Sequence, residues 1–379
     1  MANEYLAYRL ASTCLHGLAV DCYGEGMNCR TITVIVLISV ATLCPLVAAA
    51  QPAKCTTASA FLAPGKKTKW KRKRTGLWVT PQGAPDHRGY DVVVPENDPQ
   101  VLVGKFTYGP LHKDLEREEV DLFIQSKPPC GHWISYGTKL TSKDGQFGTL
   151  YGVEDDGGHA FFALSKEQSL GQGHHQAMML VKGDHSSAPL HLFVVAQGTR
   201  AVVFDIDATL TRSDGEVLRQ TVATWSDDYY DPEPRAGAAD VVRLWWSKGH
   251  QIIYVTGRPD FLCGMSRRWL DDRGFAPGAL FCTSKNSQVL PNNDGVGKFK
   301  SEKLAELQSL GLVFVAGYGN APTDVFAYEN AGIPKERTYI IGPHRGVGGT
   351  VGLTSYVDHL PGLKKILAPP VTSDTSGSR

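Results

Sequence analysis

The chain has 379 residues, of which 42 % are apolar and 20 % are charged, and its formal net charge is +1. This composition is typical of a globular protein with about two domains. A charge so close to neutral argues against a nucleic-acid partner, so any attraction to an anionic membrane must come from a local patch. The eight cysteines do not indicate a disulfide scaffold, and no spacing typical of a metal site occurs among them.

Residues 1–50 are predicted as a leader. An apolar core, Thr31–Leu43, is followed by Val47–Ala50, which offers an Ala-x-Ala cleavage site. This pattern predicts a signal peptide outside the fold, with Met27 as an alternative initiator. The competing interpretation is an uncleaved anchor, because 31–50 is about as long as the ~20 residues that a membrane helix needs. Cleavage would make the protein extracytoplasmic. Retention would anchor it in a membrane, where the positive-inside bias of the basic run at 66–74 favours a cytoplasmic body.

Residues 51–85 are predicted as a basic linker. They contain seven cations and a tryptophan within nine residues, namely Lys66, Lys67, Lys69, Trp70, Lys71, Arg72, Lys73 and Arg74. Basic runs are often solvated and without fixed structure. They also bind anionic membranes, where each cation contributes on the order of 1 kcal/mol and an indole settles at the interface. Both interpretations, a linker and a membrane contact, stay open.

Residues 86–197 are predicted as an all-β domain. Seven short β-favouring runs are separated by turn clusters such as Asp155–Gly158. The runs are 90–94, 100–108, 120–125, 132–137, 159–164, 176–181 and 190–196. Short strands at this spacing are typical of an immunoglobulin-like sandwich. Its histidines have no compact ligand pattern, so we expect no metal site there.

Residues 198–345 change to an alternation of strands and helices. Apolar runs near 201–205, 251–255, 278–282, 312–317 and 337–341 are predicted as strands, with helical patterns between them. This alternation predicts a parallel sheet with helices on both faces, an α/β Rossmann-like domain. Residues 346–379 are predicted as a partly disordered C-terminal tail, which turns to Pro, Ser and Thr from Leu363 onward.

Two aspartates stand at the end of the first predicted strand of this domain. Asp205 and Asp207 follow a run of apolar residues, which places both at the carboxyl end of a strand, where open α/β sheets bind ligands. One carboxylate can attack phosphorus there and the other can donate a proton, with a divalent metal between them. Aspartate is also common in turns, so the later motifs decide the interpretation.

Three further motifs follow in chain order. Thr256 and Gly257 end a second strand, where a hydroxyl and backbone N–H groups suit a phosphoryl oxygen. Lys300 opens a helix, and helical spacing favours it over Lys298 as the inward-facing lysine that neutralises phosphoryl charge. Asp324 lies after a Gly-rich turn near a helix start, where it is either a helix cap or a metal ligand.

Four such motifs at four strand ends make the chain similar to haloacid-dehalogenase-type phosphohydrolases. More narrowly, residues 86–342 resemble the lipin-type phosphatase domain, in the version found at the end of membrane-associated phosphatidylinositol transfer proteins of the RdgB/Nir group. The segments that carry the resemblance are Gly104–Pro110, Val181–Ser186, Ala201–Thr211, Ala238–Trp245, Tyr254–Asp260, Ala316–Asn320, Asp324–Tyr328 and Thr338–Gly342.

The resemblance implies a magnesium-dependent hydrolase of phosphatidic acid, or a related anionic lipid, at a membrane surface. Asp205 would be the nucleophile and Asp207 the acid–base group. Phosphate would be bound by Thr209, Thr256, Gly257 and Lys300, and Mg²⁺ by Asp205, Asp207 and Asp324. The transfer-protein branch generally lacks the first aspartate and is regarded as a phosphatidic-acid sensor, so binding without hydrolysis is the alternative. No protein partner is indicated.

Two positions depart from the lipin pattern. Ala208 stands where lipins have glycine between Asp207 and Thr209, and Ala321 stands where they have arginine after Asn320. Alanine at position 208 is unfavourable only if the backbone there needs a positive φ. The missing arginine affects the recognition of substrate phosphate more than the binding of a metal.

Overall fold

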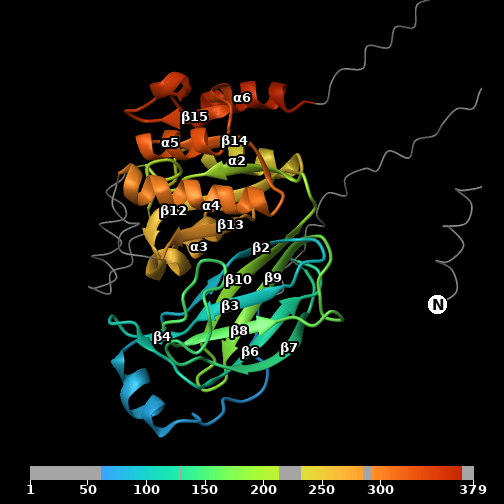
Figure 1. The fold of residues 1–379 in the computed structure, drawn as a ribbon, viewed down its shortest axis with the longest axis vertical. Coiled ribbons are helices and arrows are strands. Elements are labelled where there is room, and N and C mark those ends of the chain that lie inside the picture. The colour runs from blue at the N-terminus through green and yellow to red at the C-terminus, as the bar shows by residue number, and fades with distance from the viewer. Residues whose placement is uncertain (1–60, 129, 213–231, 285–291, 369–379) are drawn as a thin grey trace, which may run out of the picture. The chain divides into compact units, whose positions relative to one another are not determined.

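The computed structural model describes residues 61–128, 130–212, 232–284 and 292–368, all within one compact unit, Lys54–Arg379 (Figure 1). The predicted leader, residues 1–50, lies outside the described residues. In the part of the chain that is described, no helix is both long and apolar enough to cross a membrane.

The first domain is a sandwich of two sheets. The three-stranded sheet has the order β1 (Arg88–Tyr90), β3 (Val101–Lys105), β8 (His159–Ala163). The five-stranded sheet has the order β2 (Val92–Pro95), β10 (Ser187–Val195), β9 (Gly173–Val181), β6 (Glu119–Gln125), β7 (Trp133–Leu140). A short hairpin pairs β4 (Thr107–Tyr108) with β5 (Lys113–Asp114). Apolar side chains of both sheets fill one shared core, among them Leu102, Phe162, Leu122 and Met179. The predicted β-sandwich is confirmed.

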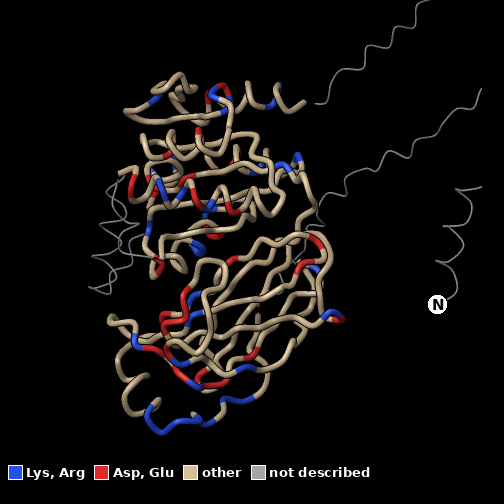
Figure 2. The backbone as a smooth tube through the Cα atoms, viewed as in Figure 1, with Lys and Arg blue, Asp and Glu red and all other residues tan. Residues whose placement is uncertain are grey.

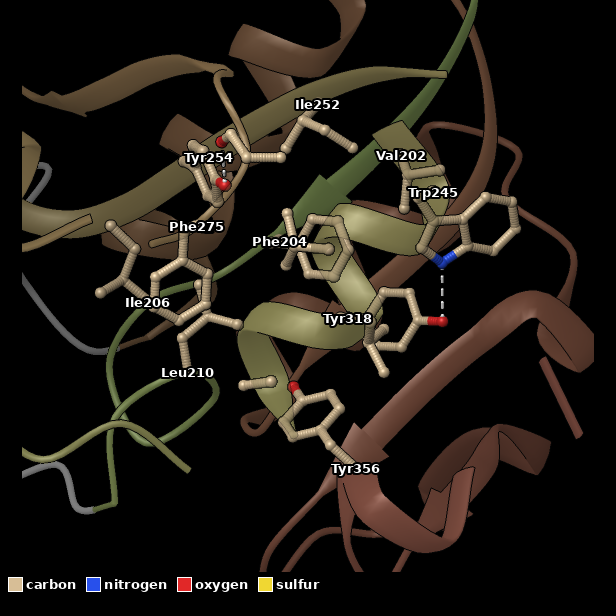
Figure 3. Packing of buried hydrophobic residues seen from close by; sticks show 14 of the residues in the cluster. Val202, Phe204, Ile206, Leu210, Trp245, Ile252, Tyr254, Phe275, Tyr318 and Tyr356 are labelled. Atoms are coloured by element: carbon tan, nitrogen blue, oxygen red, sulfur yellow. Dashed lines mark hydrogen bonds between the residues drawn. The ribbon is translucent and has the colours of Figure 1, made fainter. Parts of the chain in front are cut away.

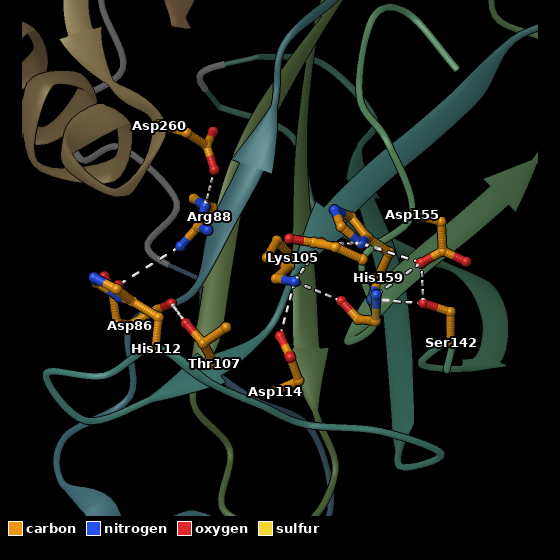
Figure 4. Close-up of polar contacts among 12 residues, drawn as sticks. Asp86, Arg88, Lys105, Thr107, His112, Asp114, Ser142, Asp155, His159 and Asp260 are labelled. Carbon is orange, nitrogen blue, oxygen red and sulfur yellow. Dashed lines mark hydrogen bonds and ion pairs between the residues drawn. The ribbon is translucent and has the colours of Figure 1, made fainter. Parts of the chain in front are cut away.

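A buried lysine organises the polar end of this sandwich. The Nζ of Lys105, which is 3 % exposed, lies 2.6 Å from Asp156 and 2.8 Å from Asp114 (Figure 4). Burial and the nearby Lys105 lower the pKa of His159. Within the described ranges, no group of three or more His, Cys, Asp or Glu side chains is arranged to hold a metal ion.

The stretch that we predicted as a linker packs on the sandwich from residue 68 onward. Thr68 N donates to Lys182 O at 2.9 Å. Trp70 packs on the sandwich core beside Gly183, where a Cβ would lie only 2.2 Å from the indole. Trp70 is therefore packed against protein instead of standing free for a membrane interface, which corrects our expectation for this residue. The slot depends on a glycine far away in the chain, so the local basic pattern did not reveal it.

The second domain is a six-stranded parallel sheet with the order β13-β12-β11-β14-β15-β16. Its elements in chain order are β11 (Arg200–Phe204), α2 (Ala238–Ser247), β12 (Gln251–Pro259), η3 (Asp260–Leu262), α3 (Cys263–Asp272), β13 (Ala279–Thr283), η5 (Asn293–Gly297), α4 (Lys298–Ser309), β14 (Val313–Gly319), α5 (Pro322–Asn330), η6 (Lys335–Arg337), β15 (Thr338–Ile341), η7 (Val347–Gly349), β16 (Val351–Leu353) and α6 (Tyr356–Ile366). The predicted α/β domain after a β-sandwich is confirmed.

β11 sends alternate side chains into two cores, as the period of two of a strand requires. Val202 and Phe204 pack with side chains of α2, α3 and α6, whereas Val203 packs with side chains of α4 and α5. In the first core, Phe204 stacks on Tyr318 with ring centroids 4.6 Å apart, and Trp245 donates to the Tyr318 hydroxyl at 2.9 Å (Figure 3). Because both faces are covered, β11 is apolar until it ends before Asp205.

Residues 351–366 are not part of a tail, which corrects the predicted boundary at 346. Tyr356 and Leu363 of α6 are 1 % and 0 % exposed and belong to the same core as Phe204. Ser355 caps α6 by accepting from Asp358 N at 3.1 Å. The shift to Pro, Ser and Thr, which we placed at Leu363, lies close to the end of α6, so the error is in starting the tail at 346.

Polar contacts join the two domains. Asp91 of the sandwich accepts from Arg267 of α3 and from Leu280 N, the latter at 2.8 Å. Arg88 of β1 pairs with Asp260, which directly follows β12 (Figure 4). Apolar side chains of β2 and β10 share a core with the side chains of α4; they are Val93, Phe193 and Val195. The loop after β12 is therefore supported from the sandwich.

Candidate functional site

The candidate site lies where the strand order reverses. β12 and β13 lie on one side of β11, and β14, β15 and β16 lie on the other. The parallel register places Phe204 beside Tyr254 and Tyr318. The residues that follow these three therefore emerge at the same edge of the sheet. This is the edge at which open α/β sheets bind ligands.

Asp205 is the first residue after β11 and is 3 % exposed. Its N–H donates to Tyr318 O at 2.9 Å. Its two carboxylate oxygens accept from Lys300 Nζ at 2.6 Å and from the Thr209 hydroxyl at 2.7 Å. Burial raises the pKa of Asp205 to about 7; Lys300 acts against this shift, and the other two aspartates of the site add to it. The charge of Asp205 is thus only partly compensated.

Lys300 bridges two of the site's carboxylates. Its Nζ lies 2.6 Å from an oxygen of Asp205 and 2.6 Å from an oxygen of Asp324. Burial lowers the pKa of Lys300, but the two carboxylates raise it above its ordinary value. Lys298 lies on the same helix and is exposed beside Glu302. Lys300 is therefore the lysine of this pair that points inward.

Asp324 caps the start of α5 and also faces Lys300 in the site, so its role as a metal ligand stays a prediction. One of its oxygens accepts from Lys300, as described above. The other accepts from the backbone N–H groups of Asn320 at 2.9 Å and Ala321 at 3.0 Å, which caps the start of α5. A helix cap and a site carboxylate are thus compatible here, because the two functions use different oxygens.

Asp207 forms an ion pair that we did not predict. Arg258 donates to its carboxylate from Nε at 3.0 Å and from Nη2 at 2.8 Å. The Thr256 hydroxyl donates to the same carboxylate at 3.0 Å. Arg258 is 1 % exposed and also donates to Ser266 at 3.0 Å. The signal was present in the sequence: an arginine directly after Thr256-Gly257, at a strand end that faces carboxylates.

The turn after Asp207 contains the first departure from the lipin pattern. Ala208 has a φ of +51°, a left-handed conformation that favours glycine. The turn is closed by a bond from Leu210 N to Ile206 O at 2.8 Å, and Arg235 Nε donates to Ala208 O at 2.9 Å. The condition under which alanine is unfavourable at this position is therefore met, and the turn bears the strain.

Replacing Ala208 by glycine should stabilise the protein by about 0.5–1 kcal/mol, because the relief of left-handed strain exceeds the added entropy of the unfolded chain. Chemical denaturation checks this prediction. The matched control is Ala305→Gly, at an exposed position inside α4, which should destabilise by about 1 kcal/mol. Equal losses in both variants would show that position 208 bears no strain.

The charges of the site favour a bound cation. Among the described residues, Asp205, Asp207 and Asp324 form ion pairs with two cations, Lys300 and Arg258, so three carboxylates stand against two positive charges there. Mg²⁺ prefers one or two carboxylates together with water. A carboxylate oxygen accepts more than one bond, so the contacts described above leave it able to bind an ion. The donor set fits Mg²⁺, although no ready-formed metal cluster occurs in the described part of the chain.

A disulfide links α3 to β13. Cys263 at the start of α3 is bonded to Cys282 of β13, with Cα atoms 6.0 Å apart. Cys130 of the sandwich is also disulfide-bonded. In the sequence these cysteines looked scattered. The first two pair because β12, which leads into α3, lies beside β13 in the sheet.

Family models match both domains. The PITM 1-3 beta-sandwich domain matches residues 85–194, and the PITM 1-3 LNS2 domain matches residues 202–342. The chain carries the β-sandwich and LNS2 domains of the PITM 1-3 family. The predicted resemblance to the lipin-type domain of membrane-associated phosphatidylinositol transfer proteins is confirmed.

Individual relatives agree with this assignment. Membrane-associated phosphatidylinositol transfer protein 1 of Homo sapiens is 38 % identical over 295 residues, which are 77 % of this chain and 21 % of the relative. Protein retinal degeneration B of Drosophila melanogaster is 33 % identical over 316 residues, 81 % of this chain and 22 % of that protein. The chain thus spans about a fifth of the length of these relatives.

Solved structures resemble the chain weakly. A phospho-aspartyl intermediate analogue of phosphoserine phosphatase matches 44 % of this chain and 99 % of its own, with 14 % identity and a TM-score of 0.29. A likeness at this level supports no inference about the activity of this chain.

Proposed function

We propose that this chain is a magnesium-dependent phosphomonoester hydrolase that acts on phosphatidic acid at a membrane surface. The observation that carries the proposal is Asp205, a buried carboxylate at the carboxyl end of β11 that is positioned by Lys300 and Thr209. A site that only binds phosphate gains nothing from a carboxylate at this point, because the two negative charges repel. A nucleophile explains its presence.

In the proposed reaction, Asp205 attacks phosphorus, the bond from phosphorus to the leaving alkoxide breaks, and an aspartyl-phosphate forms. Asp207 protonates the leaving alkoxide and then takes a proton from the water that hydrolyses this intermediate. To do so, Asp207 exchanges one of its bonds to Arg258 for the leaving oxygen. Its side chain is 17 % exposed, against 5 % for Asp205 and 0 % for Asp324, so it is the carboxylate that substrate can reach most easily.

The remaining predicted residues would hold the phosphoryl group. We assign its oxygens to the Thr209 and Thr256 hydroxyls, the Gly257 N–H and Lys300. Mg²⁺ bound by Asp205, Asp207 and Asp324 would neutralise phosphoryl charge. The Thr256 hydroxyl donates to Asp207 in the structure. In the proposed reaction this hydrogen bond breaks, and the hydroxyl then donates to the phosphoryl group.

The decisive test is phosphate release from phosphatidic acid in mixed micelles, with and without Mg²⁺. We expect release that depends on Mg²⁺ and is absent in a chelator. If neither phosphatidic acid nor any simple phosphomonoester releases phosphate with Mg²⁺ present, the hydrolase proposal fails.

The alternative is a non-catalytic protein that binds or senses phosphatidic acid. It is favoured by the bidentate contact of Arg258 with Asp207, which occupies the proposed acid–base group, and by Ala321 in place of an arginine. The relative from Homo sapiens is named for phosphatidylinositol transfer. Tight binding of phosphatidic acid without phosphate release would favour this alternative.

We further propose that the domains work in an oxidising, extracytoplasmic compartment, in association with a membrane. The Cys263–Cys282 disulfide and the disulfide-bonded Cys130 support this proposal, because disulfides are rare in the reducing cytosol. The predicted signal peptide points to the same compartment. One relative is named membrane-associated phosphatidylinositol transfer protein 1, which supports an association with a membrane but not a choice between its two sides.

Replacing Cys263 and Cys282 by serine should lower the free energy of unfolding by about 3 kcal/mol, since the bond closes a loop of 19 residues. Denaturant unfolding under non-reducing conditions measures this loss. Thiol alkylation with mass spectrometry shows whether the two cysteines are bonded in the wild-type protein. Rapid alkylation of both cysteines in protein made through a secretory pathway would contradict the compartment that we propose.

A further inference from the structure

One surface of the sandwich domain exposes three large apolar side chains close together. Leu77 and Trp78 of η1 (Thr75–Val79) are 68 % and 65 % exposed, and Leu111, in the turn between β4 and β5, is 83 % exposed. They line a groove of about 620 Å³ together with three polar residues, Arg74, Gln82 and Lys113. An exposed apolar cluster with a polar rim marks a surface that meets a partner.

The fold holds η1 so that these side chains point outward. Thr75 and Val79, at its two ends, are buried. The Thr75 hydroxyl donates to Glu118, itself 2 % exposed, at 2.6 Å. Leu77 and Trp78 lie between the two anchored ends and face away from the sandwich. Their exposure therefore results from a fixed local structure.

The hairpin that carries Leu111 rests against the same segment. A Cβ at Gly109 would lie 2.2 Å from Gln82 O, and a Cβ at Gly83 would lie 2.8 Å from Gly109 Cα. The backbone of the β4–β5 turn therefore touches η2 (Thr80–Gln82), which directly follows η1. This contact keeps Leu111 beside the exposed side chains of η1.

A band of cations flanks the apolar side chains. Lys and Arg follow one another along residues 66–74, which lead into η1 (Figure 2). Lys71 and Arg72 are paired with Glu119 at 2.8 Å and Glu116 at 2.9 Å. Six further cations are exposed and have no ion pair within the described ranges; they are Lys66, Lys67, Lys69, Lys73, Arg74 and Lys113.

We propose that Leu77, Trp78 and Leu111 form a docking wedge that inserts among the headgroups of an anionic bilayer, while the flanking cations bind those headgroups. Tryptophan and leucine beside lysine and arginine are the side chains that settle at a lipid interface. A bilayer supplies negative charge and apolar depth together, which matches this surface. This proposal rests on the proposed function in one respect: a lipid substrate requires that the protein bind a membrane.

The test is binding to phosphatidylcholine vesicles that contain phosphatidylserine and no phosphatidic acid, measured by flotation. These lipids carry no phosphomonoester, so binding does not depend on the catalytic site. Replacing all three wedge residues by serine should lower the partition coefficient at least about tenfold. The matched control replaces Val313 and Val357 of the second domain by serine; these side chains are 49 % and 55 % exposed. This control should bind vesicles as the wild type does.

Lipid-borne bromine quenching separates the two candidate indoles. Trp78→Phe should lose the quenching that vesicles cause in the wild-type protein. Trp70→Phe should keep it, since Trp70 packs on the sandwich core. Raising the salt concentration should weaken binding through the cations, because the Debye length falls to about 3 Å at 1 M.

Different results overturn different proposals. Unchanged flotation of the triple-serine variant overturns the wedge. A wild-type protein that is dimeric without lipid, when the triple-serine variant is monomeric, makes this surface a contact between two copies and also overturns it. Flotation without any phosphate release contradicts the hydrolase and leaves the wedge intact. Phosphate release from a soluble phosphomonoester without flotation contradicts the wedge and leaves the hydrolase intact.

Discussion

Replacing Asp205 by asparagine should lower Mg²⁺-dependent phosphate release by at least about a thousandfold, because the amide cannot form the aspartyl-phosphate. Asparagine is nearly the same size as aspartate and still accepts from Lys300 or Thr209, so the fold should persist. Initial rates with phosphatidic acid in mixed micelles measure the loss. The thermal midpoint of the same sample shows whether the variant is folded.

The binding of phosphatidic acid by this variant distinguishes the two functions. If the pocket holds the lipid phosphate in either case, removing a negative charge should leave its affinity unchanged or increase it. Unchanged phosphate release by Asp205→Asn would place the nucleophile elsewhere. No release from either protein, together with binding to both, would establish the sensor in place of the enzyme.

The parts of the site that sequence could predict depend on local patterns. The apolar run of β11 ends at Asp205 because both faces of the sheet are covered, and such a run is visible in one segment. The inward orientation of Lys300 follows from helical spacing to buried Leu304 and Leu307. We expected alanine at position 208 to be unfavourable only if φ there is positive, and the structure shows that it is.

The parts that sequence did not predict depend on contacts between distant segments. Arg258 reaches Asp207 across two neighbouring strands, and the strand order was not known in advance. Trp70 fits a slot left by Gly183, more than a hundred residues away. α6 has an internal proline, Pro361, and follows a strand of three residues, so its pattern was too weak to separate from a tail.

Replacing Lys300 by methionine should destabilise the metal-free protein by about 3–5 kcal/mol, because Asp205 and Asp324 then share a buried space without their cation. If the two carboxylates hold Mg²⁺, the ion should raise the thermal midpoint of this variant more than that of the wild type. Lys298→Met is the matched control on the same helix. Lys298 is exposed, so its loss should change stability by no more than about 0.5 kcal/mol.

The pH dependence gives the same prediction an independent readout. The folded-state pKa of Asp205, raised to about 7, lies above its unfolded value, so the native state binds more protons and stability falls as pH rises from about 4 to 7. Lys300 lowers the pKa of Asp205. In Lys300→Met this pKa should be higher, so stability should keep falling to a higher pH than in the wild type. In acid, where Asp205 is protonated in both proteins, the two stabilities should become more alike. A Lys300→Met protein as stable as wild type at neutral pH would show that the pair does not compensate the buried charges. A destabilised variant that gains no more from Mg²⁺ than the wild type does would remove Asp205 and Asp324 from the proposed metal site.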